Sequence, residues 1–450
     1  MEKFDLLKQR IKDSSETRGI TEYELYYSED SSISAETYRD EISAFSSSVG
    51  GLLLYRCIVD GKIGYASTEA LDEAEMDALV ARAAVNAVCI EKDEKAIIFG
   101  GASPDAYQKV PQIEFAMPTA AIIKKEAMKC RDLMYAKDSM IADGTECGAF
   151  AGQSVVRLFN SNGLDLGISA GNCGEYLQAV LDNGEEKQYE YDYLYNQFGD
   201  NEAQLQELTD TILAGAHAKF GAGKVSTGKY NVIFDHKQMK AILSTFLPAF
   251  FAENAQKGLS LLKGKVGETI AADCITITDN PFYEKNPMQI PFDGEGVPTK
   301  KKNVVENGVL KTLLYNLTSA EKDGVETTGN ASRSAASIGT RVYSFYINPG
   351  ELTRDALFEK AGNGIYITEM KGFHAGADAI TGDFSIESAG FMIENGKIGA
   401  PVKSFTVAGN FFALLKQITA IDNVLEMKAP GFTQIGAPDV LVPDMSIAGE

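Results

Sequence analysis

Residues 235–251 read DHKQMKAILSTFLPAFF, and this stretch decides how the carboxy-terminal half of the chain folds. Its apolar residues recur at the i, i+3, i+4 and i+7 positions over three turns, which predicts a helix with one buried face. Asp235 is suited to cap the first turn. Pro248 has no backbone N–H, so we expect the helix to kink or break there. The buried face consists of Met239, Ile242, Leu243, Phe246, Leu247, Phe250 and Phe251.

The composition is that of a soluble globular protein with two or three domains. The chain has 450 residues, of which 44% are hydrophobic and 23% are charged. No apolar stretch approaches the roughly 20 residues that cross a bilayer. The first residues, MEKFD, lack the features of a secretory signal. We therefore expect a cytoplasmic protein that has no membrane partner.

Charge and cysteine spacing exclude two further classes. A formal net charge of -21 disfavours direct binding to nucleic acid, because the chain would repel a phosphate backbone. The six cysteines lie far apart without a C-x-x-C pair, which argues against a zinc ribbon and against a disulfide framework. They are Cys57, Cys89, Cys130, Cys147, Cys173 and Cys274.

Local patterns predict an α+β fold whose amino-terminal domain, residues 1–222, is an antiparallel sheet with helices. A sub-boundary is possible near 100–117, where Pro104 and Pro111 lie in a polar connector. Helical spacing is found at 4–12, 70–90, 118–134 and 203–220, and strand-like segments are found at 21–27, 33–45, 51–67, 153–159, 164–170 and 177–181.

The Gly-rich segment 221–228 marks the predicted domain boundary. Residues 223–450 are predicted to form a β-rich, mostly antiparallel domain that opens with a strand at 229–234. Asn307-Gly308 and Asn395-Gly396 are typical of tight hairpins, as is Asp60-Gly61 in the first domain.

The histidines do not form a metal-binding pattern. His217, His236 and His374 are not spaced for a helical ligand pair, and none lies beside a glutamate in a helical motif. His217 and His236 are interpreted as surface or helix-end imidazoles. His374 lies in a Gly-rich loop ahead of Asp378 and Asp383, for which a role in loop structure is favoured over a chemical role.

Two carboxylates alternate with glycines in the segment 291–299, PFDGEGVPT. Asp293 and Glu295 could act as an acid/base pair. The favoured interpretation is a solvated turn, in which the glycines permit positive φ.

This same segment resembles the Pro-Phe-Asp-x-Glu-Gly-x-Pro-Thr motif of the TldD/PmbA family of metallopeptidases. Several further segments resemble the family in the same order along the chain. Together with weaker similarity upstream, they cover nearly the whole sequence. These segments are 305–310, 328–331 with Arg333, 381–384, 393–398 and 430–438.

In the catalytic members of this family, the positions that match 243–248 carry a His-Glu-x-x-x-His zinc motif. Here Leu243 and Pro248 stand at the histidine positions and Ser244 at the glutamate position, and Ile435 replaces a cysteine ligand. The chain thus resembles the branch called PmbA or TldE, often labelled a modulator of DNA gyrase. A zinc site depends on ligand number and geometry, so we expect a collapsed site without metal and a chain that is itself inactive.

The resemblance implies a cytoplasmic system of proteolysis and peptide maturation in which zinc is expected only in a TldD-like partner. The chain would act as a homodimer, or as a heterodimer with that partner, and would hold unfolded or extended peptides at a sheet edge. The candidate substrate or partner loops contain Phe292, Asp293, Glu295, Gly296, Thr299, Asn330, Arg333, His374 and Asp383.

Two alternatives remain open. The chain could be a hydrolase with a relocated site, using His374 with Asp378, Asp383 or Glu295. It could also be a non-enzymatic regulator, linked to DNA gyrase, that binds a folded partner.

Overall fold

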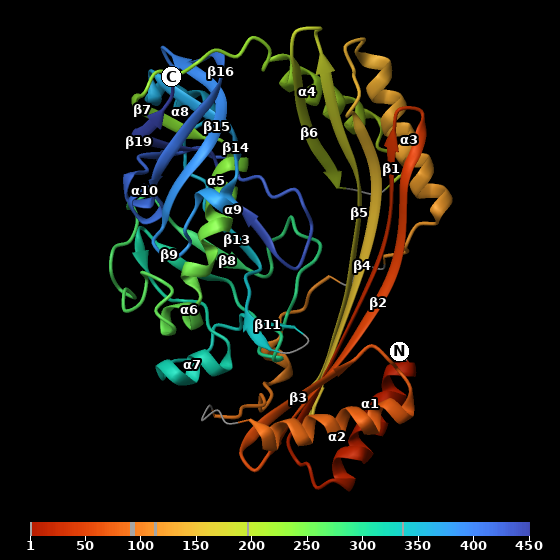
Figure 1. Ribbon diagram of the computed structural model, residues 1–450. Coiled ribbons are helices and arrows are strands. Elements are labelled where there is room, and N and C mark those ends of the chain that lie inside the picture. The colour runs from red at the N-terminus through yellow and green to blue at the C-terminus, as the bar shows by residue number, and fades with distance from the viewer. Residues whose placement is uncertain (1, 91–94, 112–114, 196–197, 335–336) are drawn as a thin grey trace.

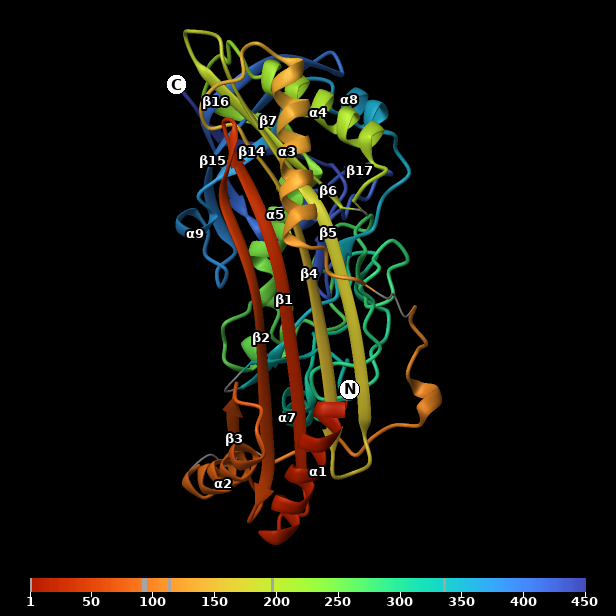
Figure 2. The ribbon, with the colours of Figure 1, turned by 90° about the vertical axis from the view of Figure 1, so that its right-hand side faces the viewer.

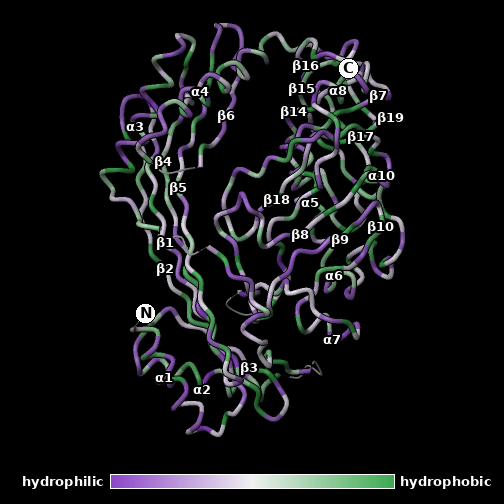
Figure 3. The backbone as a smooth tube through the Cα atoms, turned by 180° about the vertical axis from the view of Figure 1, so that it is seen from behind, coloured by the Kyte–Doolittle hydropathy of each residue, from purple (hydrophilic) through white to green (hydrophobic). Residues whose placement is uncertain are grey.

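The computed structural model describes residues 2–90, 95–111, 115–195, 198–334 and 337–450. A long twisted sheet with helices at its ends lies beside a second part built from smaller sheets (Figure 1), and the two parts also stand side by side when seen from behind (Figure 3). Helices account for 26% and strands for 39% of the chain, so the predicted α+β class is confirmed. Among these residues, no helix is long and apolar enough to span a bilayer.

The amino-terminal sheet has six strands within the described residues, in the order β3-β2-β1-β4-β5-β6, and all neighbours are antiparallel. One end of the sheet packs on α1 and α2, and the other end on α3 and α4 (Figures 1 and 2). The strands are β1 Tyr23–Tyr38, β2 Glu41–Val59, β3 Lys62–Thr68, β4 Glu146–Asn160, β5 Asp165–Asp182 and β6 Lys187–Tyr195. The helices are α1 Glu2–Thr17, α2 Glu73–Cys89, the short 3-10 helix Pro104–Ala106, α3 Ala120–Lys137 and α4 Glu202–His217.

Several strands are longer than the sequence patterns predicted. The predicted break between 27 and 33 does not exist, because β1 is hydrogen-bonded on one side to β2 and on the other to β4 along its whole length. Similarly, the two segments 164–170 and 177–181 belong to one strand, β5. Pairing on both sides overrides the weak local preference of polar, Ser-rich segments.

The tight turns predicted at Asp60-Gly61, Asn307-Gly308 and Asn395-Gly396 are confirmed. Both central residues have positive φ at Asp60-Gly61 (51° and 74°), Asn307-Gly308 (48° and 77°) and Asn395-Gly396 (51° and 75°). Such turns match the right-handed twist of the strands that they join.

The carboxy-terminal part contains two larger sheets among the described residues, mostly antiparallel, with the strand orders β10-β9-β8-β13-β18 and β16-β15-β14-β7-β19-β17. The second sheet closes on itself because β16 also pairs with β19. The strands of the first sheet are β8 Ile277–Asn280, β9 Lys302–Glu306, β10 Val309–Leu310, β13 Ser344–Ile347 and β18 Gln434–Gly436. The strands of the second sheet are β7 Gly228–Phe234, β14 Gly364–Lys371, β15 Asp383–Glu394, β16 Lys397–Asn410, β17 Ala420–Ile421 and β19 Val440–Ala448. A separate hairpin consists of β11 Ala331–Arg333 and β12 Ile338–Thr340. The helices are α5 His236–Phe246, the 3-10 helix Leu247–Phe250, α6 Ala252–Gln256, α7 Leu317–Asp323, α8 Arg354–Ala361, α9 Phe373–Gly376 and α10 Phe411–Gln417.

Helix α5 lies in the core between these two sheets, in contact with β14 and β18. The side chain of Asp235 caps it by accepting a hydrogen bond from the Lys237 N–H at 2.7 Å. The α-helix ends at Phe246 and continues as a 3-10 turn that contains Pro248. Both the predicted cap and the predicted break at the proline are confirmed.

A buried ion cluster joins the two parts of the molecule. Arg56 on β2 faces its cross-strand partner Glu24 on β1 with two hydrogen bonds, of 2.9 and 3.2 Å. Its third nitrogen reaches Glu295 of the carboxy-terminal part at 3.4 Å, and Arg333 of β11 contacts Glu24 in turn. All four side chains are at most 4% exposed. We call these residues the interdomain ion cluster.

Replacing Arg56 by Met should destabilise the protein strongly. The change leaves Glu24 and Glu295 buried with less positive charge, and breaking a buried ion pair in this way costs about 3–5 kcal/mol. Arg82→Met is the matched control, because Arg82 pairs with Glu75 at a site where its side chain is 44% exposed, and it should cost about 0.5 kcal/mol or less. Urea unfolding followed by circular dichroism measures both. Equal losses in the two variants would contradict the structural role of the cluster.

Candidate functional site

The positions that match the zinc motif lie along α5 and on the neighbouring β18. Leu243 is fully buried in the core, and Ile435 packs against the same core from β18. Ser244 is exposed, and Pro248 lies in the 3-10 turn. Leucine, proline and isoleucine side chains carry no nitrogen, oxygen or sulfur, so the Ser244 hydroxyl is the one possible donor of the four. A zinc site takes three or four such donors, and this set does not fit the ion.

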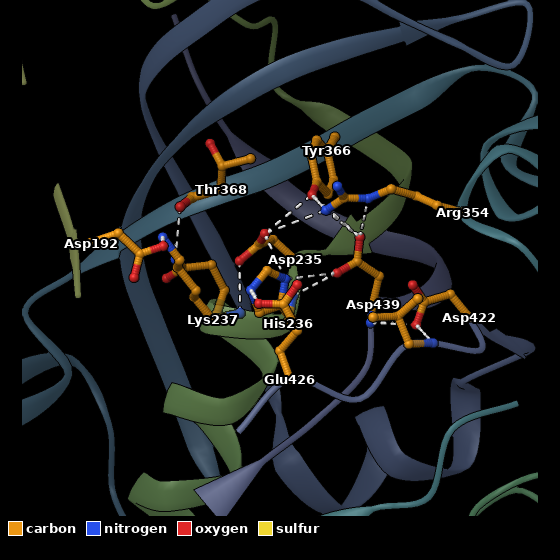
Figure 4. A network of polar contacts seen from close by, with 12 residues as sticks. Asp192, Asp235, His236, Lys237, Arg354, Tyr366, Thr368, Asp422, Glu426 and Asp439 are labelled. Atoms are coloured by element: carbon orange, nitrogen blue, oxygen red, sulfur yellow. Dashed lines mark hydrogen bonds and ion pairs between the residues drawn. The ribbon is translucent and has the colours of Figure 1, made fainter. Parts of the chain in front are cut away.

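A cluster of polar side chains gathers at the first turn of α5 (Figure 4). We call Asp235, His236, Arg354, Tyr366 and Asp439 the α5 polar cluster. The backbone N–H of His236 donates to Asp439 at 2.7 Å, and the ring Nδ1 of His236 lies 3.2 Å from Asp235 and 3.4 Å from Asp439. The Arg354 Nε donates to Asp439 at 3.0 Å, and the Tyr366 hydroxyl donates to Asp235 at 3.1 Å. The cluster therefore connects α5 to α8, β14 and the chain just before β19.

The charges of the α5 polar cluster balance within the protein. Burial by itself lowers the pKa of His236, but its hydrogen bonds to Asp235 and Asp439 raise that pKa to about 10. His236 is thus an imidazolium at neutral pH, and with Arg354 it offsets the two aspartates. Three of these residues offer ligand atoms within 4.8 Å of one another, the spacing of a possible metal site. A metal cation bound there would have to displace a proton from the His236 imidazolium and the Arg354 guanidinium from Asp439. The positive charge already present therefore disfavours metal binding.

The sequence patterns identified only the local part of this cluster. The sequence predicts Asp235 as a cap and His236 as a surface or helix-end imidazole. His236 does lie at the helix end, but its side chain is only 19% exposed and it pairs with Asp439, 203 residues further along the chain. No spacing rule connects residues so far apart in the sequence.

The Gly-rich segment 291–299 is buried between the two parts of the molecule rather than forming a solvated turn. Phe292 packs among residues of β4 and β5 in the long sheet. Gly296 has a φ of +82°, and an added Cβ would lie 2.3 Å from a methyl group of Leu164, so only glycine fits this approach. Thr299 donates its hydroxyl to the Ile290 carbonyl at 2.7 Å.

The two carboxyl groups of this segment are held by protein donors. Asp293 accepts backbone N–H groups of Glu295, Val297 and Ala331 at 2.8–3.0 Å, while Glu295 accepts the Leu317 N–H at 2.9 Å besides contacting Arg56. Burial, together with the charge of Glu295, raises the pKa of Asp293, and burial also raises that of Glu295. Such pKa values suit acid/base chemistry, but both side chains are at most 2% exposed. The hydrogen bonds and the burial of both carboxyl groups therefore favour a structural role for Asp293 and Glu295.

The remaining candidates divide between the interior and the surface. Asn330 is buried and donates to Asp279 at 2.7 Å, and Arg333 donates to the Gly294 carbonyl at 2.6 Å. His374 and Asp383 are exposed on α9 and β15. Among the hydrogen bonds and ion pairs of the described residues, none joins His374 to Asp378, Asp383 or Glu295, and Glu295 is enclosed in the ion cluster. The structure therefore does not assemble the relocated hydrolase site.

A cavity of about 880 Å³ opens where the end of the long sheet meets the carboxy-terminal part. It is lined by residues of β3, α6, α7 and β12, including Ile63, Tyr65, Gln256, Asn316 and Ile338. Both β3 and β12 are edge strands of their sheets in the described part of the chain. The cavity is large enough for several residues of an extended peptide.

Replacing His236 by Gln should lower stability in a pH-dependent way. The pKa of His236 is higher in the folded state, about 10, than its ordinary value, so its stabilising contribution is complete below about pH 6.5 and is lost as the pH rises through 10. The difference in melting temperature between wild type and variant should thus narrow from pH 6 to pH 10. His217→Gln, at a 40% exposed side chain, is the matched control. A constant difference would contradict the imidazolium assignment.

Comparisons with known proteins agree with this architecture. Residues 227–449 match the model of the PmbA/TldA metallopeptidase C-terminal domain, and residues 23–87 match that of PmbA/TldA metallopeptidase domain 1. An uncharacterized protein of Methanocaldococcus jannaschii is 30% identical over 413 residues, which cover 90% of this chain and 92% of that protein. Metalloprotease PmbA of Escherichia coli O157:H7 is 29% identical over 313 residues, 68% of this chain and 65% of the relative.

Solved structures of two similar proteins have the same fold over nearly the whole chain. A Thermotoga maritima protein described as a modulator of a DNA gyrase superimposes with a TM-score of 0.89 at 27% identity, covering 99% of this chain and 100% of that one. TldE from Thermococcus kodakarensis has the same fold, with a TM-score of 0.87 at 23% identity and coverage of 98% and 99%. The chain belongs to the PmbA/TldD family of metallopeptidase-like proteins.

Proposed function

We propose that this chain is a PmbA/TldE-like subunit of a cytoplasmic metallopeptidase system, that it binds no zinc of its own, and that it works as a partner or substrate-holding subunit. Zinc belongs to a TldD-like sister chain in this proposal. The chain contributes to proteolysis and peptide maturation through its shape and its binding surfaces.

The observation that carries the proposal is the environment of the zinc-motif positions. Leu243 is fully buried, and Ile435 packs against the same core across the contact between α5 and β18. Restoring one histidine would therefore add a polar group to an apolar interior, where it costs free energy unless it is hydrogen-bonded. The loss involves all three family ligands together, which favours a subunit without metal over one damaged at a single residue.

The cavity beside β3 and β12 supports a substrate-holding role. Extended peptides commonly bind by adding a strand to a sheet edge, which requires backbone groups more than particular side chains. Two edge strands border this cavity, one from each part of the molecule. Unfolded peptides of varied sequence are the substrate class that such a site accommodates.

A second candidate function is a non-enzymatic regulator that binds a folded partner. The structural neighbour from Thermotoga maritima is described as a modulator of a DNA gyrase, and this description motivates the candidate. Affinity purification from cell extract separates the two functions. Recovery of a zinc-bearing sister chain supports the peptidase subunit, whereas recovery of a topoisomerase without such a chain supports the regulator.

Purified protein should contain far less than one zinc per chain and should not cleave unfolded peptides by itself, because the motif positions provide one donor atom. Inductively coupled plasma mass spectrometry and a peptide cleavage assay test this. Tightly bound zinc at one per chain, with cleavage by the isolated chain, would overturn the proposal.

Replacing all four motif positions should create a zinc site. The combined variant has Leu243→His, Ser244→Glu, Pro248→His and Ile435→Cys, and it is expected to bind about one zinc because α5 and β18 are already in contact. The control carries only Ser244→Glu, at an exposed position, and should bind none. A folded combined variant without zinc would show that these positions do not form a site in this chain.

A further inference from the structure

Strand β6 carries a tyrosine at every second position. Its sequence is KQYEYDYLY, so Tyr189, Tyr191, Tyr193 and Tyr195 lie on one face of the sheet, because successive side chains of a strand point to opposite faces. Helices α3 and α4 pack on the other face, where Leu194 joins the core that they share with β5. The tyrosines therefore lie on the face opposite these helices. At this end of the long sheet, β6 is the strand nearest to the carboxy-terminal part (Figure 1).

The tyrosine rings form a continuous aromatic surface with side chains of β4 and β5. Tyr176 of β5 lies directly across from Tyr193, and their ring centres are 4.9 Å apart. The rings of Tyr195 and Phe150 are 5.7 Å apart, although β5 runs between them, because the residue of β5 at that point is Gly174. All four aromatic residues are partly exposed. We call the following residues the tyrosine surface: Phe150, Tyr176, Tyr191, Tyr193 and Tyr195.

Lysines of the protein itself already bind at one end of this stripe of tyrosines. The amines of Lys219 and Lys371 each lie 5.2 Å from the ring centre of Tyr189, and the amine of Lys237 lies 6.0 Å from that of Tyr191. A cation over an aromatic face is attracted by the electrons of the ring. Among the described residues, no lysine or arginine lies over the other rings of the tyrosine surface in this way. Those rings therefore have faces that a cation from outside can use.

Two carboxylates lie on the same face of the sheet as these rings. Glu36 of β1, Gly148 of β4, Tyr176 of β5 and Tyr193 of β6 are successive cross-strand partners, so they share one face. Gly148 has no side chain to separate Glu36 from Tyr176. Glu146, two residues before Gly148 on β4, points to the same face. Both glutamates are exposed, and among the described residues neither carboxylate has a hydrogen bond or an ion pair.

We propose that the tyrosine surface, together with Glu36 and Glu146, binds arginine or lysine side chains of an extended polypeptide segment. The rings supply faces for the cation, and the carboxylates supply negative charge and hydrogen-bond acceptors. Arginine fits both, since its guanidinium stacks on aromatic rings and donates to carboxylates. Alternate side chains of an extended segment are about 6.6 Å apart, which is also the spacing of the tyrosines along β6.

Charge favours a basic segment over other occupants. The chain carries a net charge of -21, so it attracts basic segments and repels acidic ones. A neutral segment would leave the two carboxylates without a partner. The surface lies at the end of the long sheet that packs on α3 and α4, whereas the cavity beside β3 lies at the end that packs on α1 and α2 (Figure 1). It is therefore a site in addition to the one in the proposed function.

Fluorescence anisotropy of the isolated full-length chain with labelled peptides tests the site. A peptide of alternating serine and arginine should bind about tenfold or more tightly than the same peptide with glutamine in place of arginine. Glu36→Gln combined with Glu146→Gln should weaken binding of the arginine peptide about tenfold. The matched control combines Glu351→Gln with Glu359→Gln, which removes the same charge from exposed residues of the carboxy-terminal part. It should change the affinity by about twofold or less.

The rings are tested separately from the charge. Tyr176→Leu combined with Tyr193→Leu should weaken binding about fivefold, whereas Tyr176→Phe combined with Tyr193→Phe keeps both rings and should bind like the wild type. Circular dichroism checks that each variant is folded, and the two glutamine variants change only exposed side chains. Equal affinity of the wild type for both peptides would overturn the proposal, as would equal losses in the two glutamine variants or in the leucine and phenylalanine variants. Because the measurement involves neither zinc nor cleavage, its failure would leave the proposed function standing.

Discussion

The contact of Arg56 with Glu24 and Glu295 is the constraint on which the rest of the structure depends. It lies between two adjacent strands of the long sheet and a loop of the carboxy-terminal part. Buried charges tolerate little displacement, because each one that loses its partner is left in a medium of low dielectric constant. An apolar interface could shift by a fraction of a residue at little cost, whereas the interface that contains this ion cluster has a single favourable register. The same two parts of the molecule also border the cavity of about 880 Å³.

This constraint also explains the role of the most recognisable segment in the chain. The segment 291–299 contributes Glu295 to the ion cluster, packs Phe292 against the long sheet and requires glycine at 296 to approach Leu164. Each of these properties concerns how the two parts meet. A motif rich in acids and glycines invites a chemical interpretation, but here its residue types follow from close packing and charge pairing.

Features that a few adjacent residues determine can be predicted from the sequence alone. The turns at Asn307-Gly308 and Asn395-Gly396, the cap at Asp235 and the break at Pro248 each depend on a few adjacent residues. Features that depend on residues far apart in the sequence cannot be predicted in this way. In the sequence, Asp293 and Glu295 resemble a solvated turn, but in the structure Ala331, Leu317 and Arg56 donate their hydrogen bonds. The ring of His236 lies against Asp439 as well as against its neighbour Asp235, and hydrogen bonds to both carboxylates outweigh burial and raise its pKa. The full length of β1 cannot be predicted from its residue pattern, because pairing with β2 and β4 determines it.

The α5 polar cluster removes a difficulty with the proposal of a subunit without metal. In a zinc enzyme the ion helps to hold its ligand-bearing elements together. Here α5 is held at its first turn by Asp235, His236 and Asp439, and in its later turns by aromatic packing of Phe246 against Phe411 at 4.7 Å between ring centroids. The helix therefore has anchors at both ends that do not use the motif positions. Leucine at 243 then adds to the core between those anchors, which supports the proposal of a subunit that does not need an ion to hold α5 in place.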